Sequence, residues 1–297
     1  MLSVLIPTYN YDITSLVKEV HAQLLVAKIP FEIICLDDCS TDTDSIQQNK
    51  SINTLSHASY VVLEENMGRS NIRNLLSDQA QYEFILFIDG DSLIIDELYI
   101  QRYIDAISED SAIIYGGRVH PEKVASERLL RWKYGVKRED TTAENRKKKP
   151  YKSILCNNTL MTKTTFNTVG FEKAIKQYGH EDTIFAFKAS KLKMKIQHIE
   201  NPVLHGDVDF NEVFFQKTHQ SLKNLNYIYK EQLIDASFIT FLSTYDVLKK
   251  YKFNYVLAFV HKIGYRFFKW QLTSKNPSLH IFNLFRLSYF CTLNLRT

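Results

Sequence analysis

Two aspartates separated by a single glycine follow an apolar segment in the first third of the chain. Residues 84–88 are all Phe, Ile or Leu, and Asp89, Gly90 and Asp91 come directly after them. A short apolar run bounded by polar residues is typical of a strand buried on both faces of a parallel sheet. Ligands bind at the carboxyl ends of such strands, and two neighbouring carboxylates there attract a cation or a hydrogen-bond donor. The alternative is a plain turn, because Asp and Gly are common turn residues.

Three further polar clusters also follow strand-like segments. In a doubly wound sheet the carboxyl ends of the strands converge on one rim, so residues far apart in sequence line one crevice. A lone turn does not predict this convergence, and the sequence therefore favours a binding crevice. The clusters are PTYN at 7–10, LDDCSTD at 36–42 and ENMGRSNIRN at 65–74.

Strand-like and helix-like segments alternate along the first half of the chain. This rhythm predicts right-handed crossovers and a parallel sheet covered by helices. Beyond residue 120 the pattern is less regular, although strands and helices are still expected. The predicted strands are 1–7, 31–38, 59–65, 84–88, 112–120, 153–163 and 195–206, and the predicted helices are 14–28, 41–55, 68–80, 96–108, 179–191 and 210–231.

Length and composition fit one large folded domain with an appendage. The 297 residues are 45% hydrophobic, which is enough to bury a sizeable core. The four cysteines form no CxxC pair and a strand begins at Leu2 without a leader, so we expect a reducing cytoplasm. No uncharged apolar run approaches the roughly eighteen residues that span a bilayer, so we expect no transmembrane anchor. The net charge of +4 by itself indicates neither a nucleic-acid partner nor a membrane.

Two segments are strongly basic. Between 123 and 152, eleven Lys or Arg oppose four acids and include the run NRKKKP, which predicts a solvated loop or, alternatively, a flexible arm that meets acceptor phosphates. After Asp246 there is no acidic residue, while nine Lys or Arg are interleaved with twelve aromatic residues. Such a tail is typical of a peripheral helix on an anionic membrane. The alternative is a helical appendage packed on the rest of the chain or on a second subunit, as in a homo-oligomer.

Taken together, the clusters resemble the family 2 glycosyltransferases with the GT-A fold. The match to PTYN, DDCSTD, NxGxxxxRN and DGD covers about the first 120 residues, and GHED at 179–182 and VLHG at 203–206 extend it. The resemblance implies an α/β fold with a Rossmann-like, mostly parallel sheet flanked by helices and a helical C-terminal appendage. It also implies a GT-A catalytic domain at 1–208, with a nucleotide-sugar half at about 1–120 and an acceptor half at about 121–208, followed by a helical region at 209–297.

The resemblance further implies which residues hold a nucleotide-sugar donor. Thr8 and Tyr9 would contact the nucleotide, Tyr9 by packing on the base. Gly68 would let the backbone turn closely beneath it, since glycine lacks a Cβ. Arg73 would reach the base or a phosphate, and the alternative for this residue is an ordinary charge on a helix surface.

The family's carboxylates suggest further roles. Asp38 is similar to the carboxylate that accepts a hydrogen bond from the uracil imide, the alternative being that Asp38 or Asp37 caps the following helix. Asp91 would bind a hard divalent ion, Mg or Mn, and Asp89 would hold the ribose or a metal-bound water. His205 would complete the metal shell, although a lone His is more often structural. The cation would stabilise charge on the leaving nucleoside diphosphate.

Asp182 resembles the base that takes the proton of the attacking hydroxyl. A carboxylate is an adequate base when it lies within hydrogen-bond reach of that hydroxyl. Glu181 is the competing candidate, and the alternative for both is an acidic helix start favoured by the helix dipole. His180 receives no role. A single displacement of this kind inverts the anomeric configuration.

The predicted function is therefore that of an inverting, metal-dependent glycosyltransferase of the hexosyl- or N-acetylhexosaminyl type. The resemblance favours a UDP-sugar donor and a glycan or polyprenol-linked acceptor in bacterial surface polysaccharide synthesis, at the inner face of the cytoplasmic membrane. A sugar nucleotidyltransferase and a dinucleotide oxidoreductase are disfavoured because no glycine-rich loop follows the first strand. A catalytically silent binding or scaffold protein of the same fold is the alternative.

Overall fold

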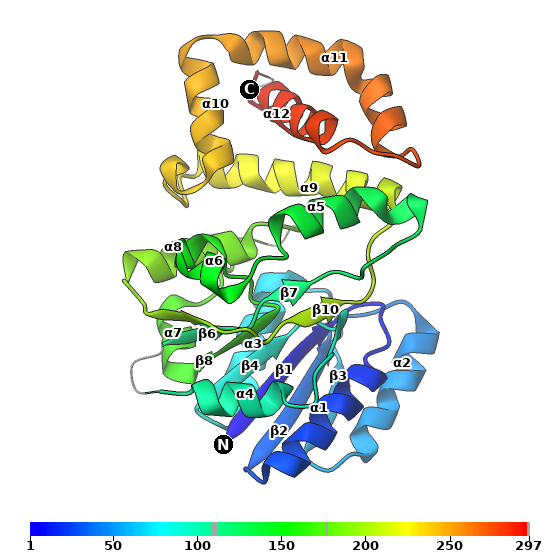
Figure 1. Ribbon diagram of the computed structural model, residues 1–297, viewed down its shortest axis with the longest axis vertical. Helices are drawn as coiled ribbons and strands as arrows, with labels where there is room; N and C mark the ends of the chain where they lie inside the picture. The colour runs from blue at the N-terminus through cyan, green and yellow to red at the C-terminus, as the bar shows by residue number, and fades with distance from the viewer. Residues whose placement is uncertain (109–111, 176–177, 296–297) are drawn as a thin grey trace. The chain divides into compact units, whose positions relative to one another are not determined.

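The computed structural model describes residues 1–108, 112–175 and 178–295 (Figure 1). The chain divides into two compact units. The C-terminal unit includes residues 122–138, which we expected in the acceptor half of the catalytic domain. The first unit comprises Met1–Pro121, Glu139–Lys176 and Glu181–Asp207, and the second comprises Glu122–Arg138, Gln177–His180 and Val208–Thr297.

The first unit is built on a seven-stranded sheet within the part of the chain that the structure describes. Its strand order is β3-β2-β1-β4-β8-β6-β9, and β8 is the strand that runs antiparallel to its neighbours. The prediction of a mostly parallel α/β sheet is confirmed. The strands are β1 (Leu2–Thr8), β2 (Phe31–Asp37), β3 (Ala58–Val62), β4 (Phe84–Ile88), β6 (Ile113–Tyr115), β8 (Asn158–Thr162) and β9 (Ile196–His198).

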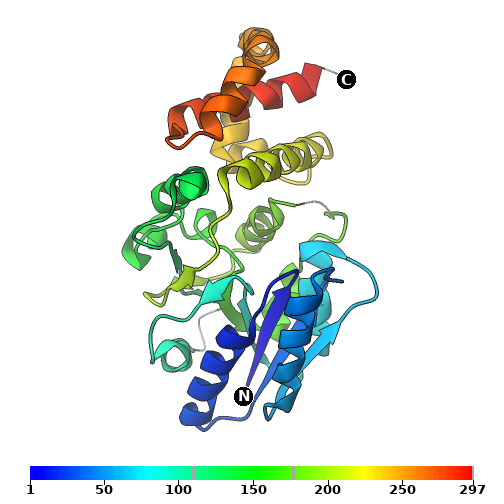
Figure 2. The ribbon, with the colours of Figure 1, turned by 90° about the vertical axis from the view of Figure 1, so that its right-hand side faces the viewer.

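Both faces of this sheet are buried, because apolar residues occupy consecutive positions of its central strands. Val4 and Ile6 of β1 pack in one cluster with Val17 of α1 (Thr14–Ala27) and Tyr103 of α4 (Tyr99–Ala106). Phe87 of β4 points to the other face, where its ring lies 5.2 Å from that of Phe166 in α7 (Lys163–Val169). Helices therefore lie on both sides of the sheet (Figure 2).

Two segments that we predicted as single strands are each divided between two sheets. The segment 112–120 forms β6 and then β7, and 195–206 forms β9 and then β10. Gly116 and Gly117 explain the break, since a Cβ on Gly116 would lie 2.5 Å from the Asn201 carbonyl oxygen and Gly117 has a φ of +101°. The second sheet has the order β5-β10-β7, with β5 at Ser92–Leu93, β10 at Val203–His205 and β7 at Arg118–Val119.

Only part of the run NRKKKP at 145–150 fits the predicted solvated loop or arm. Its first three residues belong to α6 (Ala143–Lys147), and one of them, Arg146, is only 2% exposed. The Arg146 guanidinium donates to the backbone carbonyls of Gly116 at 3.0 Å and Ile199 at 2.6 Å. It therefore fixes the point where both strand pairs change sheet, and the acceptor-phosphate interpretation is wrong for this residue. Lys147, like the two lysines after it, is exposed.

The second unit is helical, as the sequence predicted. Its core joins Leu130, Phe215, Phe268, Leu272 and Phe285, contributed by four helices. Within the described residues we find no helix with the length and apolar character needed to cross a membrane. The main helices are α5 (Leu129–Arg138), α9 (Asn211–Lys230), α10 (Thr240–Lys250), α11 (Phe253–Leu272) and α12 (Leu279–Leu295).

Candidate active site

The loop that carries the two aspartates is pressed against the end of β1. A Cβ on Gly90 would lie 2.9 Å from Ile13 Cγ2, 3.2 Å from the Pro7 carbonyl oxygen and 3.3 Å from Thr8 Oγ1. A glycine permits this close approach because it has no side chain. The carboxyl ends of β1 and β4 therefore meet, at the point where the strand order of the sheet reverses, as ligand crevices in such sheets require.

Asp89 is held by a buried arginine. Arg73, on α3 (Gly68–Gln79), is 2% exposed, and its Nη2 lies 2.5 Å from Asp89 Oδ1. Its Nη1 also donates to the Arg69 carbonyl at 3.3 Å. Burial alone would lower the pKa of Arg73, but the carboxylates of Asp89, Asp182 and Glu181 raise it. Arg73 is thus no surface charge, because its guanidinium anchors the aspartate loop.

Asp91 lies beside His205 because two short strands pair. His205 on β10 is opposite Ser92 on β5, and the Gly206 N–H donates to the Asp91 carbonyl at 3.0 Å. His205 Nε2 is consequently 3.1 Å from Asp91 Oδ2. Burial raises the pKa of Asp91, but the His205 hydrogen bond and charge, together with Arg118, hold that pKa well below its usual range.

Two residues that the sequence analysis did not single out support His205. His120 Nδ1 lies 2.6 Å from Asp140 Oδ1, and the His120 backbone N–H donates to Asp140 Oδ2 at 3.0 Å. His120 Nε2 in turn lies 3.3 Å from His205 Nδ1. When Asp140 accepts from His120 and His120 accepts from His205, the neutral His205 ring has its Nε2 lone pair directed at Asp91. No sequence motif marks this chain of contacts, since it depends on tertiary structure.

The Asp91–His205 pair fits a divalent cation. Two acceptors 3.1 Å apart repel unless His205 is protonated or a cation lies between them. Asp91 Oδ1 is buried and makes no hydrogen bond, and Arg118 Nη2 lies 3.8 Å from it. Among the described residues no three His, Cys, Asp or Glu form a group that could hold a metal. An ion here would take two protein ligands and complete its shell with ligand oxygens and water, as Mg²⁺ often does.

Asp38 binds the start of α3. Its Oδ1 accepts from the Met67 N–H at 2.7 Å and its Oδ2 from the Gly68 N–H at 3.0 Å. Burial raises the pKa of Asp38, although these two N–H groups lower it. Gly68 has a φ of +79°, a conformation that favours glycine. A cavity of about 230 Å³ lies against this turn and is lined by residues from Glu65 to Asn71.

Asp37 and Thr8 are nearly buried, whereas Tyr9, directly after β1, is exposed. Asp37 is 1% exposed, and its Oδ2 accepts from the Tyr60 hydroxyl at 2.5 Å. Thr8 is nearly buried and its Oγ1 lies 3.3 Å from the Tyr11 carbonyl. Tyr9 is 51% exposed, so its ring is available to a ligand.

Asp182 lies close to the aspartate loop. Its Oδ1 accepts from the Cys156 N–H at 3.2 Å, and the Asp89 N–H donates to the carbonyl of the next residue, Asn157, at 3.1 Å. The pKa of Asp182 is raised to about 6, mainly by burial; the charges of Glu181 and Asp89 also raise it, whereas that of Arg73 lowers it. The candidate base and the aspartate loop therefore hydrogen-bond to two consecutive residues, Cys156 and Asn157, just before β8.

Glu181 differs from its neighbour in exposure and partner. It is 4% exposed and its Oε1 lies 3.5 Å from Arg69 Nη1. Both acids belong to the first turn of α8 (Glu181–Lys191), where the helix dipole favours negative charge. His180, in the C-terminal unit, has its Nε2 3.1 Å from Ser221 Oγ of α9.

A mostly parallel sheet with acids along the rim of its first strands is the arrangement of the GT-A glycosyltransferases. The chain belongs to glycosyl transferase family 2, whose sequence profile matches residues 3–179. The glycosyltransferase TuaG of Bacillus subtilis, named for teichuronic acid biosynthesis, is 37% identical over 93 residues, which are 31% of this chain and 36% of TuaG. TarS of Staphylococcus aureus, a poly(ribitol-phosphate) beta-N-acetylglucosaminyltransferase, is 32% identical over 133 residues, 42% of this chain and 23% of TarS.

Solved structures support the same fold. The crystal structure of S. aureus TarS 1–349 with UDP has a TM-score of 0.54 at 19% identity and covers 99% of this chain and 91% of that one. The mannosyltransferase PcManGT from Pyrobaculum calidifontis, solved with GDP-Man and Mn²⁺, has a TM-score of 0.52 at 14% identity and covers 77% of this chain and 64% of that one. At these identities the likeness establishes the fold, and the matched segments span well under half of TuaG and TarS.

Replacing Arg73 with Met should destabilise the first unit markedly. The change leaves Asp89 beside an apolar side chain, and breaking a buried ion pair from one side costs about 3 kcal/mol of unfolding free energy or more. Arg102→Met is the matched control, because its pair with Asp96 is 39% and 36% exposed, and exposed pairs contribute about 0–1 kcal/mol. Urea unfolding of both variants checks this, and equal losses would contradict the anchoring role of Arg73.

Proposed function

We propose that this protein is an inverting, metal-dependent glycosyltransferase that moves a sugar from a UDP-sugar to a hydroxyl of a glycan or polyprenol-linked acceptor. The observation that carries the proposal is the placement of Asp182 and the Asp91–His205 pair around one aspartate loop. The names of TuaG and TarS, which refer to teichuronic acid and poly(ribitol-phosphate), support a bacterial surface polymer as acceptor. The UDP bound to TarS supports the nucleotide.

The donor would lie along the carboxyl ends of β1, β2 and β4. Tyr9 would pack on the base and Thr8 would contact the nucleotide. Each Asp38 oxygen accepts one backbone N–H and keeps a second lone pair, so Asp38 could still accept from the uracil imide. Asp89, oriented by Arg73, would face the ribose or a metal-bound water.

Mn²⁺ or Mg²⁺ bound to Asp91 and His205 would stabilise the developing charge on the leaving diphosphate as a Lewis acid. Asp140 and His120 would orient the His205 ring, since outer hydrogen bonds fix the tautomer of a metal-binding histidine. The Mn²⁺ in the structure of PcManGT supports this assignment.

Asp182 would act as the general base. In a single displacement the acceptor oxygen bonds to the anomeric carbon as the bond to the diphosphate breaks, and the acceptor proton passes to an Asp182 oxygen. A pKa of about 6 makes Asp182 a stronger base than an ordinary aspartate, yet leaves it ionised at neutral pH. Glu181, buried beside Arg69, would support the site and not exchange the proton.

The proposed location is the cytoplasm, where we expect the four cysteines to remain reduced.

The decisive experiment measures release of UDP from a panel of UDP-sugars with Mn²⁺, with and without glycan or lipid-linked acceptors. Release that needs Mn²⁺ and rises with an acceptor supports the enzyme. Tight binding of UDP without any turnover would instead favour the catalytically silent scaffold.

Metal binding should depend on Asp91 and on His120, which supports His205. We expect Asp91→Asn to abolish Mn²⁺ binding in the presence of UDP, and His120→Ala to weaken it by about 10–100-fold, as changes behind a metal ligand do. Electron paramagnetic resonance of free Mn²⁺ measures the binding directly. The exposed His57 provides a control, and His57→Ala should bind normally. Unchanged Mn²⁺ affinity in His120→Ala would contradict the supporting role.

Asp182→Asn should lose activity and gain stability at neutral pH. Loss of a general base costs about 10²–10⁴-fold in turnover. Because the folded pKa is raised to about 6, the stabilising contribution of Asp182 is complete below the unfolded pKa and is lost as pH rises through 6. The variant should therefore be about 2 kcal/mol more stable than wild type at pH 7.5 and similar at pH 4.

Urea unfolding at the two pH values and UDP release at pH 7.5 test this pair of effects. The exposed Asp78 is the control, and Asp78→Asn should change neither quantity. An Asp182→Asn variant that retains most of its activity, or that is less stable at pH 7.5, would rule out Asp182 as a base with a raised pKa.

A further inference from the structure

Helix α11 has two apolar faces, of which one is covered. On the inner face His261, Phe268 and Leu272 are buried in the core of the C-terminal unit. Five large apolar side chains follow one another on the outer face at intervals of three or four residues, and all are more than half exposed. This outer stripe consists of Val256 (56%), Phe259 (62%), Ile263 (67%), Phe267 (51%) and Trp270 (67%).

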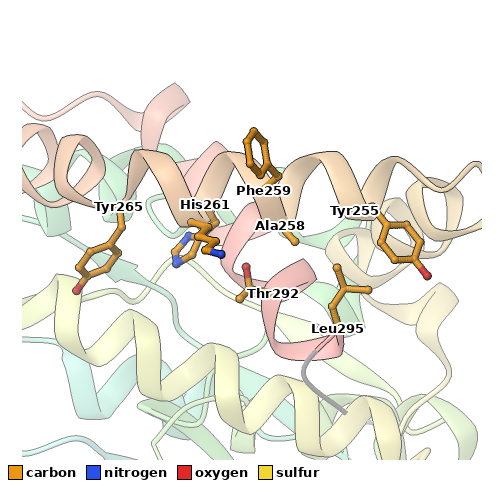
Figure 3. A pocket seen from close by; sticks show the side chains of 8 residues that line it. Tyr255, Ala258, Phe259, His261, Tyr265, Thr292 and Leu295 are labelled. Carbon is orange, nitrogen blue, oxygen red and sulfur yellow. The ribbon is translucent and has the colours of Figure 1, made fainter.

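Apart from Phe259, the residues of the outer stripe do not border the cavity that α11 and α12 share. In Figure 3 the Phe259 ring projects away from α12, whereas Ala258 and His261 lie on the α12 side of the helix. This cavity of about 630 Å³ is lined by Ala258 and His261 of α11 and by Thr292 of α12, and Phe259 and Lys262 also border it. A contiguous exposed apolar surface of this kind marks an interaction site in a folded protein.

The charged residues that α11 itself carries are all basic, and one of them, Lys269, pairs with Glu212 of α9 at 3.2 Å. Lys252, Lys262 and Arg266 are exposed beside it, and residues 247–297 contain no Asp or Glu. Tyr251, at the start of the helix, is 65% exposed, and Trp270 lies near its end. Tyr and Trp are enriched where an apolar phase meets water, and Lys and Arg are favoured on the polar flanks of helices in that position.

We infer that the outer stripe of α11 lies in the interface of a membrane that contains anionic lipid. Pairing of the stripe with a second copy would bring Lys262 and Arg266 of both copies together with no acid from the same segment to compensate. An anionic lipid surface accommodates both features, since acyl chains cover the apolar side chains and phosphates attract the basic ones. The inference goes beyond the proposed sugar transfer and does not depend on it.

Sedimentation of the full chain with phospholipid vesicles tests the inference. Wild type should sediment with phosphatidylcholine vesicles containing about 30% phosphatidylglycerol, and far less with phosphatidylcholine alone, because each basic residue contributes about fivefold in affinity. Lys262→Gln with Arg266→Gln should therefore weaken binding about 25-fold. Phe259→Ser, Ile263→Ser and Trp270→Ser together should weaken it by about 100-fold or more.

A matched triple variant controls for lost surface apolarity. Leu25, Val26 and Val61, in the first unit, are 52%, 80% and 50% exposed, and their replacement by Ser should leave vesicle binding unchanged. Equal binding to neutral and anionic vesicles, or no loss in the stripe variant, would overturn the inference. So would sedimentation equilibrium that shows a wild-type dimer and a monomeric stripe variant, since the stripe would then be a subunit interface.

Discussion

The electrostatics of one crowded rim govern the first unit. Asp89, Asp91 and Asp182 lie around the carboxyl end of β4 and the amino end of β8, where like charges repel and burial disfavours ionisation. Two buried arginines offset this repulsion. Arg73 contacts Asp89 at 2.5 Å, and Arg118 lies 3.8 Å from both Asp89 and Asp91. Because each arginine serves more than one acid, the rim is a single electrostatic unit and not a set of separate pairs.

His205 reaches this rim because two neighbouring segments of chain leave the large sheet together and continue as paired strands of the small sheet. β6 and β9 pair in the large sheet, and their continuations β7 and β10 pair in the small one. Arg146 fills the space at the break, under Gly117. The same change of sheet carries Arg118 and His205 towards Asp91. An interruption of regular strands is thus what assembles the candidate metal site.

The sequence predicted the parts of this arrangement that depend on local pattern. The apolar run 84–88 identified β4, and the four polar clusters identified the rim. Residues that follow parallel strands lie close together at one edge of the sheet, even when they are far apart in sequence. The support of His205 by His120 and the burial of Arg146 were beyond such reasoning, since a lone histidine and a basic run carry no signal of their tertiary partners. The broken strands were missed for the same reason, because the contact between Gly116 and Asn201 at the break joins residues far apart in sequence.

The net charge of +4 is the sum of two regions in which charged residues are arranged differently. In the first unit, buried arginines pair with partly buried acids, so their interactions are screened less by salt than those of exposed charges. Around the outer stripe of α11 the basic residues are exposed and have no acid in their own segment, so any partner they attract is lost as ionic strength rises. Salt therefore distinguishes the two regions: the ion pairs of the candidate active site should persist at an ionic strength where attraction of α11 to a charged surface has faded.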